Sequence, residues 1–199
     1  QFNMVKRGAH IDRPLVVLIF TLLIGGCMIF ASAALGYLAR GSGNVSSVVF
    51  NHLVLGAGIG LVALIVTSNI DYRMWKRFAP FLFVLALIAT ALVFLPQIGL
   101  MHGGGKRWIE IAGISFQPAE ALKIGTIIMA AAYFSAIRPR IQSIWYTVGG
   151  LFSILAIPSV LLILQPDIGT LGVITLGALA IFLTADVPWK HIAVTAFVV

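Results

Sequence analysis

Long stretches without formal charge constrain the fold of this chain more than any other feature. Five of them span residues 14–39, 41–70, 78–105, 141–166 and 168–185. A helix needs about 20 apolar residues to cross the hydrocarbon core of a bilayer. The chain is 60% apolar and 10% charged, whereas about a quarter of the residues in soluble domains are charged. We therefore predict an all-α integral membrane protein, built as a polytopic helical bundle.

One further span requires charged residues within it. Residues 124–137 hold only 14 uncharged positions, but extension back over Lys123 and Glu120 to Pro118 gives full length. This predicts six spans and the start of a seventh, all in one transmembrane domain over residues 1–199. The expected spans lie near 14–39, 48–69, 78–101, 118–137, 141–165, 168–185 and 191–199, the last incomplete. Because the chain opens at Gln1 and stops inside an apolar run, we expect it to be part of a longer protein.

The basic residues predict an orientation. If the N-terminus is cytoplasmic, nine Lys and Arg residues fall on the cytoplasmic side and four on the outer side, which is the usual bias. The net charge of +7 is spread singly or in small groups between apolar runs, so it does not indicate nucleic acid binding. Residues 71–77, with Asp71, Arg73 and Trp75, read as a cytoplasmic loop touching anionic lipid headgroups.

Cofactor chemistry has little support in the sequence. Cys27 is the only cysteine, which excludes an internal disulfide and a metal site made of cysteines. The four histidines are scattered over different segments without the spacing of metal ligands. We therefore predict no metal site in this chain, and no cofactor is evident.

The most informative segment runs from a glycine turn at 103–105 to residue 123. Two cations, Lys106 and Arg107, follow the glycines, and Trp108 comes next. Lys123 lies inside the following span, where an ionisable group is costly and usually faces an interior cavity. A cavity bordered by these three cations would attract a phosphate group, because Arg binds phosphate through two parallel hydrogen bonds.

The same segment also admits a purely structural interpretation. Pro118 suits the first position of a helix because its missing N–H has no partner there. Gln117 would then be a cap, and Glu120 a carboxylate favoured by the positive helix end. Glu120 and Lys123 are three residues apart, so they would form an ion pair. The sequence alone leaves the structural and functional interpretations open.

A second polar motif, residues 165–170, falls between the fifth and sixth spans on the same predicted side. In a structural interpretation Asp167 caps the next helix together with Thr170. In a functional interpretation Gln165, Asp167 and Thr170 contribute to the site formed by the first segment. Both motifs lie at the same predicted membrane face, so one outer site built from the two is geometrically allowed.

Together these motifs resemble the signature of the SEDS family (shape, elongation, division and sporulation), the RodA/FtsW/SpoVE-like peptidoglycan polymerases. The resemblance rests on residues 106–109, 117–120 with Lys123, and 165–170, and extends to residues 12–14 and 71–73. Ala119 stands where many members have Ser. We lean towards the FtsW-like division type, although division, elongation and sporulation members share these motifs.

The resemblance implies a fold of about ten transmembrane helices in the bacterial inner membrane, with this chain as its N-terminal part. It implies a glycosyltransferase that polymerises lipid II into glycan strands, a class B penicillin-binding protein (a transpeptidase) as partner, and room for a divalent cation. The family's expected catalytic Asp lies beyond Val199, so we expect this chain alone to be inactive.

The residue roles follow as a hypothesis. We expect Arg107, supported by Lys106 and Lys123, to bind the lipid pyrophosphate, while Glu120 and Asp167 orient these cations. Two other function classes remain open. A flippase or other transporter of lipid-linked precursors would use the same cations, although no internal repeat is visible. A non-catalytic scaffold of the cell-wall synthesis machinery would tolerate their replacement by alanine.

Overall fold

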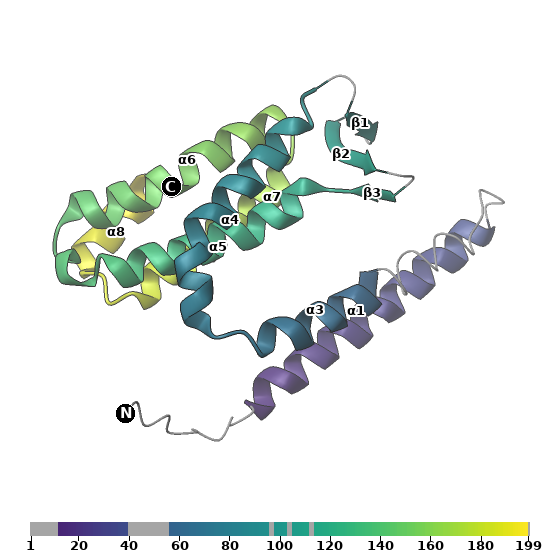
Figure 1. Ribbon diagram of the computed structural model, residues 1–199, viewed down its shortest axis with the longest axis horizontal. Helices are drawn as coiled ribbons and strands as arrows, with labels where there is room; N and C mark the ends of the chain where they lie inside the picture. Colours follow the sequence, from purple (N-terminus) through teal and green to yellow (C-terminus); the bar gives the residue numbers. More distant parts are fainter. Residues whose placement is uncertain (1–11, 40–55, 96–97, 103–104, 112–113, 199) are drawn as a thin grey trace. The chain divides into compact units, whose positions relative to one another are not determined.

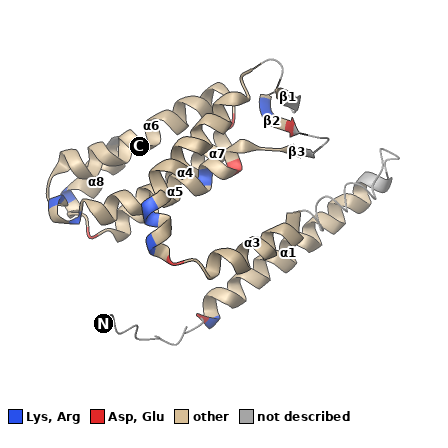
Figure 2. Ribbon diagram, viewed as in Figure 1, with Lys and Arg blue, Asp and Glu red and all other residues tan. Residues whose placement is uncertain are grey.

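The computed structural model describes residues 12–39, 56–95, 98–102, 105–111 and 114–198. It divides into two compact units, unit 1 over Gln1–Ile70 and unit 2 over Asp71–Val199. Each unit is described by itself. The described helices have few charged residues along their length, and Lys, Arg, Asp and Glu residues lie mostly towards helix ends and on a small sheet (Figure 2).

Unit 1 contains two apolar helices, α1 (Arg13–Ala39) and α3 (Ile59–Ser68). Asp12 caps the start of α1, because its Oδ1 accepts a hydrogen bond from the Leu15 N–H at 3.2 Å. No residue of α3 is buried, and apolar side chains such as Leu22 on α1 are exposed. Such surfaces suit contact with lipid rather than water. The predicted second span began at residue 48, and residues 48–55 lie outside the described part.

Unit 2 opens with α4 (Tyr72–Leu92), whose start corrects the sequence prediction. Residues 72–77 are the first turns of this helix rather than a loop. Asp71 caps the helix by accepting the Arg73 N–H at 2.8 Å, and Lys76 donates from Nζ to the Ser135 hydroxyl at 2.9 Å. Our count of uncharged residues placed the helix start at 78 because it ignored helical turns that carry charge.

The end of α4 also differs from the predicted span of 78–101. The helix ends at Leu92, shortly before Pro96, and the residue that precedes a proline disfavours helical geometry. Three short strands follow, β1 (Gly99–His102), β2 (Gly105–Ile111) and β3 (Ile114–Phe116). They form an antiparallel sheet in the order β1-β2-β3. The all-α prediction therefore lacked a small sheet, which lies beyond the end of α4 and before the start of α5 (Figure 1).

Four more helices complete unit 2. They are α5 (Pro118–Ala136), α6 (Ile144–Leu164), α7 (Ile168–Thr184) and α8 (Trp189–Val198), with a short 3-10 turn at Arg138–Arg140. Helix α5 packs against α4, α6 and α7. The core between them is apolar and includes Phe134, whose ring meets that of Phe182 edge to face with centroids 5.6 Å apart.

Four described helices, α1, α4, α5 and α6, are long and apolar enough to cross a membrane. Helix α7 has 17 residues and the apolar segment Gly56–Ser68 is also shorter. The count of six complete spans therefore stays a prediction.

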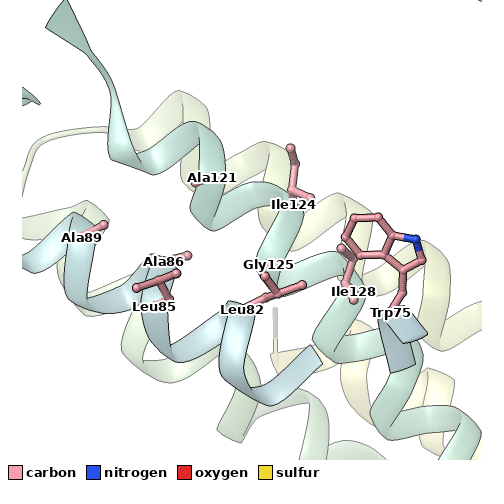
Figure 3. A pocket seen from close by; sticks show the side chains of 9 residues that line it. All are labelled: Trp75, Leu82, Leu85, Ala86, Ala89, Ala121, Ile124, Gly125 and Ile128. Carbon is pink, nitrogen blue, oxygen red and sulfur yellow. The ribbon is translucent and has the colours of Figure 1, made fainter. Parts of the chain in front are cut away.

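An apolar groove follows the contact between α4 and α5 on the surface of unit 2, with a volume of about 310 Å³. Figure 3 shows Trp75 and Ile128 at one end and Ala89 and Ala121 towards the other. Its floor includes Gly125, where an added Cβ would lie 3.4 Å from the Ala86 Cβ. The small residues therefore let the two helices approach closely, and the groove presents an apolar surface of the kind that faces lipid.

Two adjacent glycines of α6 meet opposite surroundings. A Cβ at Gly150 would lie 2.3 Å from the ring and hydroxyl of Tyr133, whereas a Cβ at Gly149 meets nothing within 4 Å. The Tyr133 hydroxyl donates to the Tyr146 carbonyl at 2.9 Å, so the ring is fixed across the α5–α6 contact.

We predict that Gly150→Ala destabilises the protein by about 1–3 kcal/mol through overpacking. Gly149→Ala, the matched control, should change stability little. Thermal unfolding of both variants in detergent measures the difference. Equal stability of the two variants would contradict the described packing of Tyr133.

Candidate functional site

The turn between α6 and α7 gathers several buried polar contacts of unit 2. Gln165 is 1% exposed, and its Nε2 donates to the Thr90 carbonyl at 2.9 Å. Thr90 lies in the last turn of α4, where backbone carbonyls lack partners within the helix. The Gln165 side chain therefore provides a hydrogen-bond donor for a free carbonyl at the end of α4, a helix distant in sequence. Its Oε1 has no hydrogen-bond partner among the described residues.

Arg107 on β2 binds the backbone of the same turn. Its Nε donates to the Gln165 carbonyl at 3.2 Å, and its Nη2 donates to the Pro166 carbonyl. Gly105 allows this approach, because a Cβ there would lie 2.9 Å from the Gln165 oxygen. Strand β2 is therefore held directly against the turn.

The pairing of β1 with β2 breaks simple alternation at the two neighbouring cations. Leu100 pairs with Trp108 and Met101 with Lys106, so Arg107 is the extra residue of a bulge in β2. Bulges of this kind redirect a side chain. Lys106 and Trp108 are partly exposed, and of the two cations only Arg107 bonds to the turn among the described residues.

Asp167 uses both of its carboxylate oxygens at the start of α7. Oδ1 accepts the Thr170 N–H at 3.2 Å, and Oδ2 accepts Nε2 of Gln117 at 2.8 Å. The side chain of Asp167 caps α7 as predicted, and Asp167 is 6% exposed. The bond to Gln117 joins the beginnings of two helices, because Gln117 immediately precedes α5.

The first two turns of α5 carry the remaining predicted residues. Pro118 occupies the first helical position. Gln117 stands at the cap position, but its side chain bonds Asp167 and makes no cap bond to its own helix. Glu120 and Lys123 form the predicted ion pair at 2.8 Å, and their side chains are 60% and 26% exposed, respectively. One of the three Lys123 N–H donors is therefore paired.

The geometry groups the predicted residues in two sets. The turn cluster contains Arg107, Gln117, Gln165, Asp167 and Thr170 together with Thr90, and a separate pair consists of Glu120 and Lys123. The structure corrects one expected contact. Among the described residues Asp167 forms no ion pair: its oxygens accept from Thr170 and Gln117, and Arg107 is oriented by backbone carbonyls instead.

Sequence reasoning missed Thr90, because a threonine within an apolar span carries no signal for a distant partner. It also passed over His191, which is buried at the other end of unit 2 with Nδ1 2.8 Å from the Thr147 hydroxyl. Within the described residues, no three His, Cys, Asp or Glu side chains gather as a metal site would require.

Comparison with known proteins places this arrangement in a family. Residues 13–199 match the FtsW/RodA/SpoVE family, described as cell cycle protein. The chain is 30% identical over 176 residues to the probable peptidoglycan glycosyltransferase FtsW of Coxiella burnetii, covering 88% of this chain and 47% of that protein. The chain thus spans about half the length of the curated relatives it matches.

Two solved structures share the fold. The rod shape determining protein RodA of Thermus thermophilus has a TM-score of 0.59 and 26% identity, covering 71% of this chain and 46% of that one. A peptidoglycan synthase complex that coordinates polymerisation and crosslinking has a TM-score of 0.65 and 24% identity, covering 87% of this chain and 51% of that one. These matches confirm a helical membrane protein, and the chain belongs to the FtsW/RodA/SpoVE family of cell cycle proteins.

Proposed function

We propose that the full protein is a peptidoglycan glycosyltransferase that polymerises lipid II at the outer face of the bacterial inner membrane. Family membership supports this activity, since the similar Coxiella burnetii protein is named a probable peptidoglycan glycosyltransferase. That relative carries the name FtsW, which fits the division type expected from the sequence. The proposed orientation has a cytoplasmic N-terminus, so that the sheet and the turn cluster face outward.

The proposed reaction joins two lipid-linked sugars. The 4-hydroxyl oxygen of the acceptor forms a bond to the anomeric carbon of the donor, while the bond from that carbon to the pyrophosphate oxygen breaks. The hydroxyl proton passes to a base, which by family resemblance is an Asp located after residue 199. Undecaprenyl pyrophosphate leaves with growing negative charge, so a fixed cation beside it lowers the barrier.

One observation carries the assignment of the site, namely the state of Lys123. It lies on the second turn of a membrane-length helix, and among the described residues Glu120 is its only ionic partner. Two N–H donors of its ammonium therefore remain for an oxygen ligand. We place Lys123 on the pyrophosphate, with Lys106 and Arg107 as neighbouring positive charges.

A transpeptidase of the class B penicillin-binding type is the proposed partner. The fold match to a synthase complex that coordinates polymerisation with crosslinking supports such an assembly. A divalent cation bound to the lipid pyrophosphate would be compatible with the partly paired Lys123.

We predict that Lys123→Gln in the full-length protein lowers glycan synthesis by about 100-fold, since an interaction with developing charge is lost. The assay uses the protein purified with its cognate transpeptidase, fluorescent lipid II and gel separation of the glycan strands. Lys190→Gln, the same change at an exposed lysine of α8, is the matched control and should keep wild-type activity.

Full activity of the Lys123 variant would remove this residue from the site. Absence of polymer from the wild type, together with movement of lipid II between leaflets in vesicles, would instead support a transporter.

A second prediction concerns Asp167. Replacement by Ala removes the cap of α7 and the bond to Gln117, which should cost about 1–2 kcal/mol of stability and reduce synthesis. Asn keeps an oxygen for the Thr170 N–H, and rotation of the Gln117 amide restores the other bond. We therefore expect Asp167→Asn to retain most stability and activity. Thermal unfolding and the same gel assay measure both, and equal loss in the two variants would show that the negative charge itself is required.

A further inference from the structure

The contacts at the α6–α7 turn close into a ring. One side of the ring is the bond from the Arg107 side chain to the turn. The opposite side is the bond between Gln117 and Asp167. Strand pairing joins them, because Ile109 and Phe116 are paired across β2 and β3. In order, the ring runs through Arg107, Pro166, Asp167, Gln117, Phe116 and Ile109.

Every link of this ring is short and direct. Pro166 and Asp167 are adjacent in the chain, as are Phe116 and Gln117. Arg107 lies two residues before Ile109 on β2. The ring therefore links Gln117 to Asp167, and with them the first turn of α5 to the first turn of α7.

Arginine suits this position better than lysine for a geometric reason. Its planar guanidinium presents parallel N–H donors, so it reaches the Gln165 and Pro166 carbonyls together. A lysine ammonium is a point charge on a flexible stem and does not hold two adjacent carbonyls in fixed geometry. Both carbonyls belong to the protein backbone, so these bonds are structural and exist without a substrate.

We infer that Arg107 is a positioning residue, which clamps β2 onto the α6–α7 turn and thereby fixes the start of α5, whose second turn carries Lys123. This inference rests on the proposed function, because it assigns Lys123 to the pyrophosphate. Arg107 then acts through Gln117 and α5 rather than by touching the lipid. It differs from the sequence prediction, in which Arg107 binds the phosphate directly.

Two variants separate these roles. Arg107→Lys keeps the positive charge and removes the two-pronged clamp. Gly105→Ala keeps every charge but inserts a methyl group 2.9 Å from the Gln165 oxygen, which pushes β2 off the turn. The controls are Arg138→Lys, at an exposed ion pair with Asp186, and Gly149→Ala, which meets nothing within 4 Å.

In the lipid II assay with the full-length protein and its transpeptidase, we expect both test variants to lose about 10- to 100-fold in kcat, the scale of a small misplacement. The KM for lipid II should stay within about twofold, since a change confined to kcat reports alignment rather than ground-state binding. The controls should match the wild type. A raised KM with unchanged kcat in Arg107→Lys, or full activity of Gly105→Ala, would overturn the inference.

A double variant tests the ring itself. Gln117→Ala opens the ring at its other contact, so adding Arg107→Lys should increase the loss by no more than about threefold, because coupled residues are not additive. Multiplication of the two single losses would show that Arg107 and Gln117 act independently and would contradict the ring.

Amide hydrogen exchange gives a measurement that needs no activity. The Thr170 amide bonded to Asp167 and the amides of residues 119–123 should exchange faster in Arg107→Lys and Gly105→Ala than in the wild type and the controls. Unchanged exchange would contradict positioning even if activity falls. If the wild type makes no polymer but the two variants still exchange faster than it does, the clamp is retained and the glycosyltransferase proposal fails.

Discussion

Helix ends in a membrane protein leave carbonyl and amide groups that still require hydrogen bonds, and the α6–α7 turn satisfies several of them at once. An unpaired backbone group in a low-dielectric surrounding is costly. The Gln165 side chain donates to a carbonyl at the end of α4, and the Asp167 carboxylate accepts an N–H at the start of α7. Arg107 donates to two carbonyls of the turn itself. The position of the sheet and of α5 depends on these bonds, because Gln117 and β2 are both attached to the same turn.

The same constraint assigns different tasks to the two kinds of cation. A guanidinium can saturate several carbonyls in fixed directions, which is the use the structure makes of Arg107. An ammonium with one bond to a carboxylate, as in Lys123 and Glu120, keeps donors free and moves with less restriction. Arg107 is therefore a rigid support, and Lys123 is an adaptable cation. Lys123 is the residue proposed to bind the pyrophosphate, because its contacts leave N–H donors free.

Sequence reasoning succeeded where the determining signal is local. Helix α5 begins at Pro118 and ends near residue 136 as predicted, because proline, a first-turn carboxylate and an apolar run all lie within that segment. It failed for α4, where charged turns continue a helix beyond the hydrocarbon. It missed the sheet because β2 does not alternate apolar and polar residues along its sequence, and its pairing with β1 is interrupted at Arg107. The contacts of Gln165 with Thr90 and Arg107 join residues 75 and 58 positions apart, and no local pattern encodes such pairs.

Charged side chains are exposed at one end of unit 2 and buried with hydrogen bonds at the other. At one end the Arg138–Asp186 pair is wide, at 3.6 Å, with both side chains about four-fifths exposed, and Arg140 lies over the Tyr146 ring at 5.1 Å. Exposed pairs of this kind contribute little to stability, and their geometry can vary without consequence for the core. At the other end Asp167 is buried, both of its oxygens are bonded and the Arg107 guanidinium is held by the turn. Exposed charge of this kind suits an orientation signal, whereas phosphate chemistry requires fixed geometry, so the end with the closed ring is the one that fits the proposed reaction.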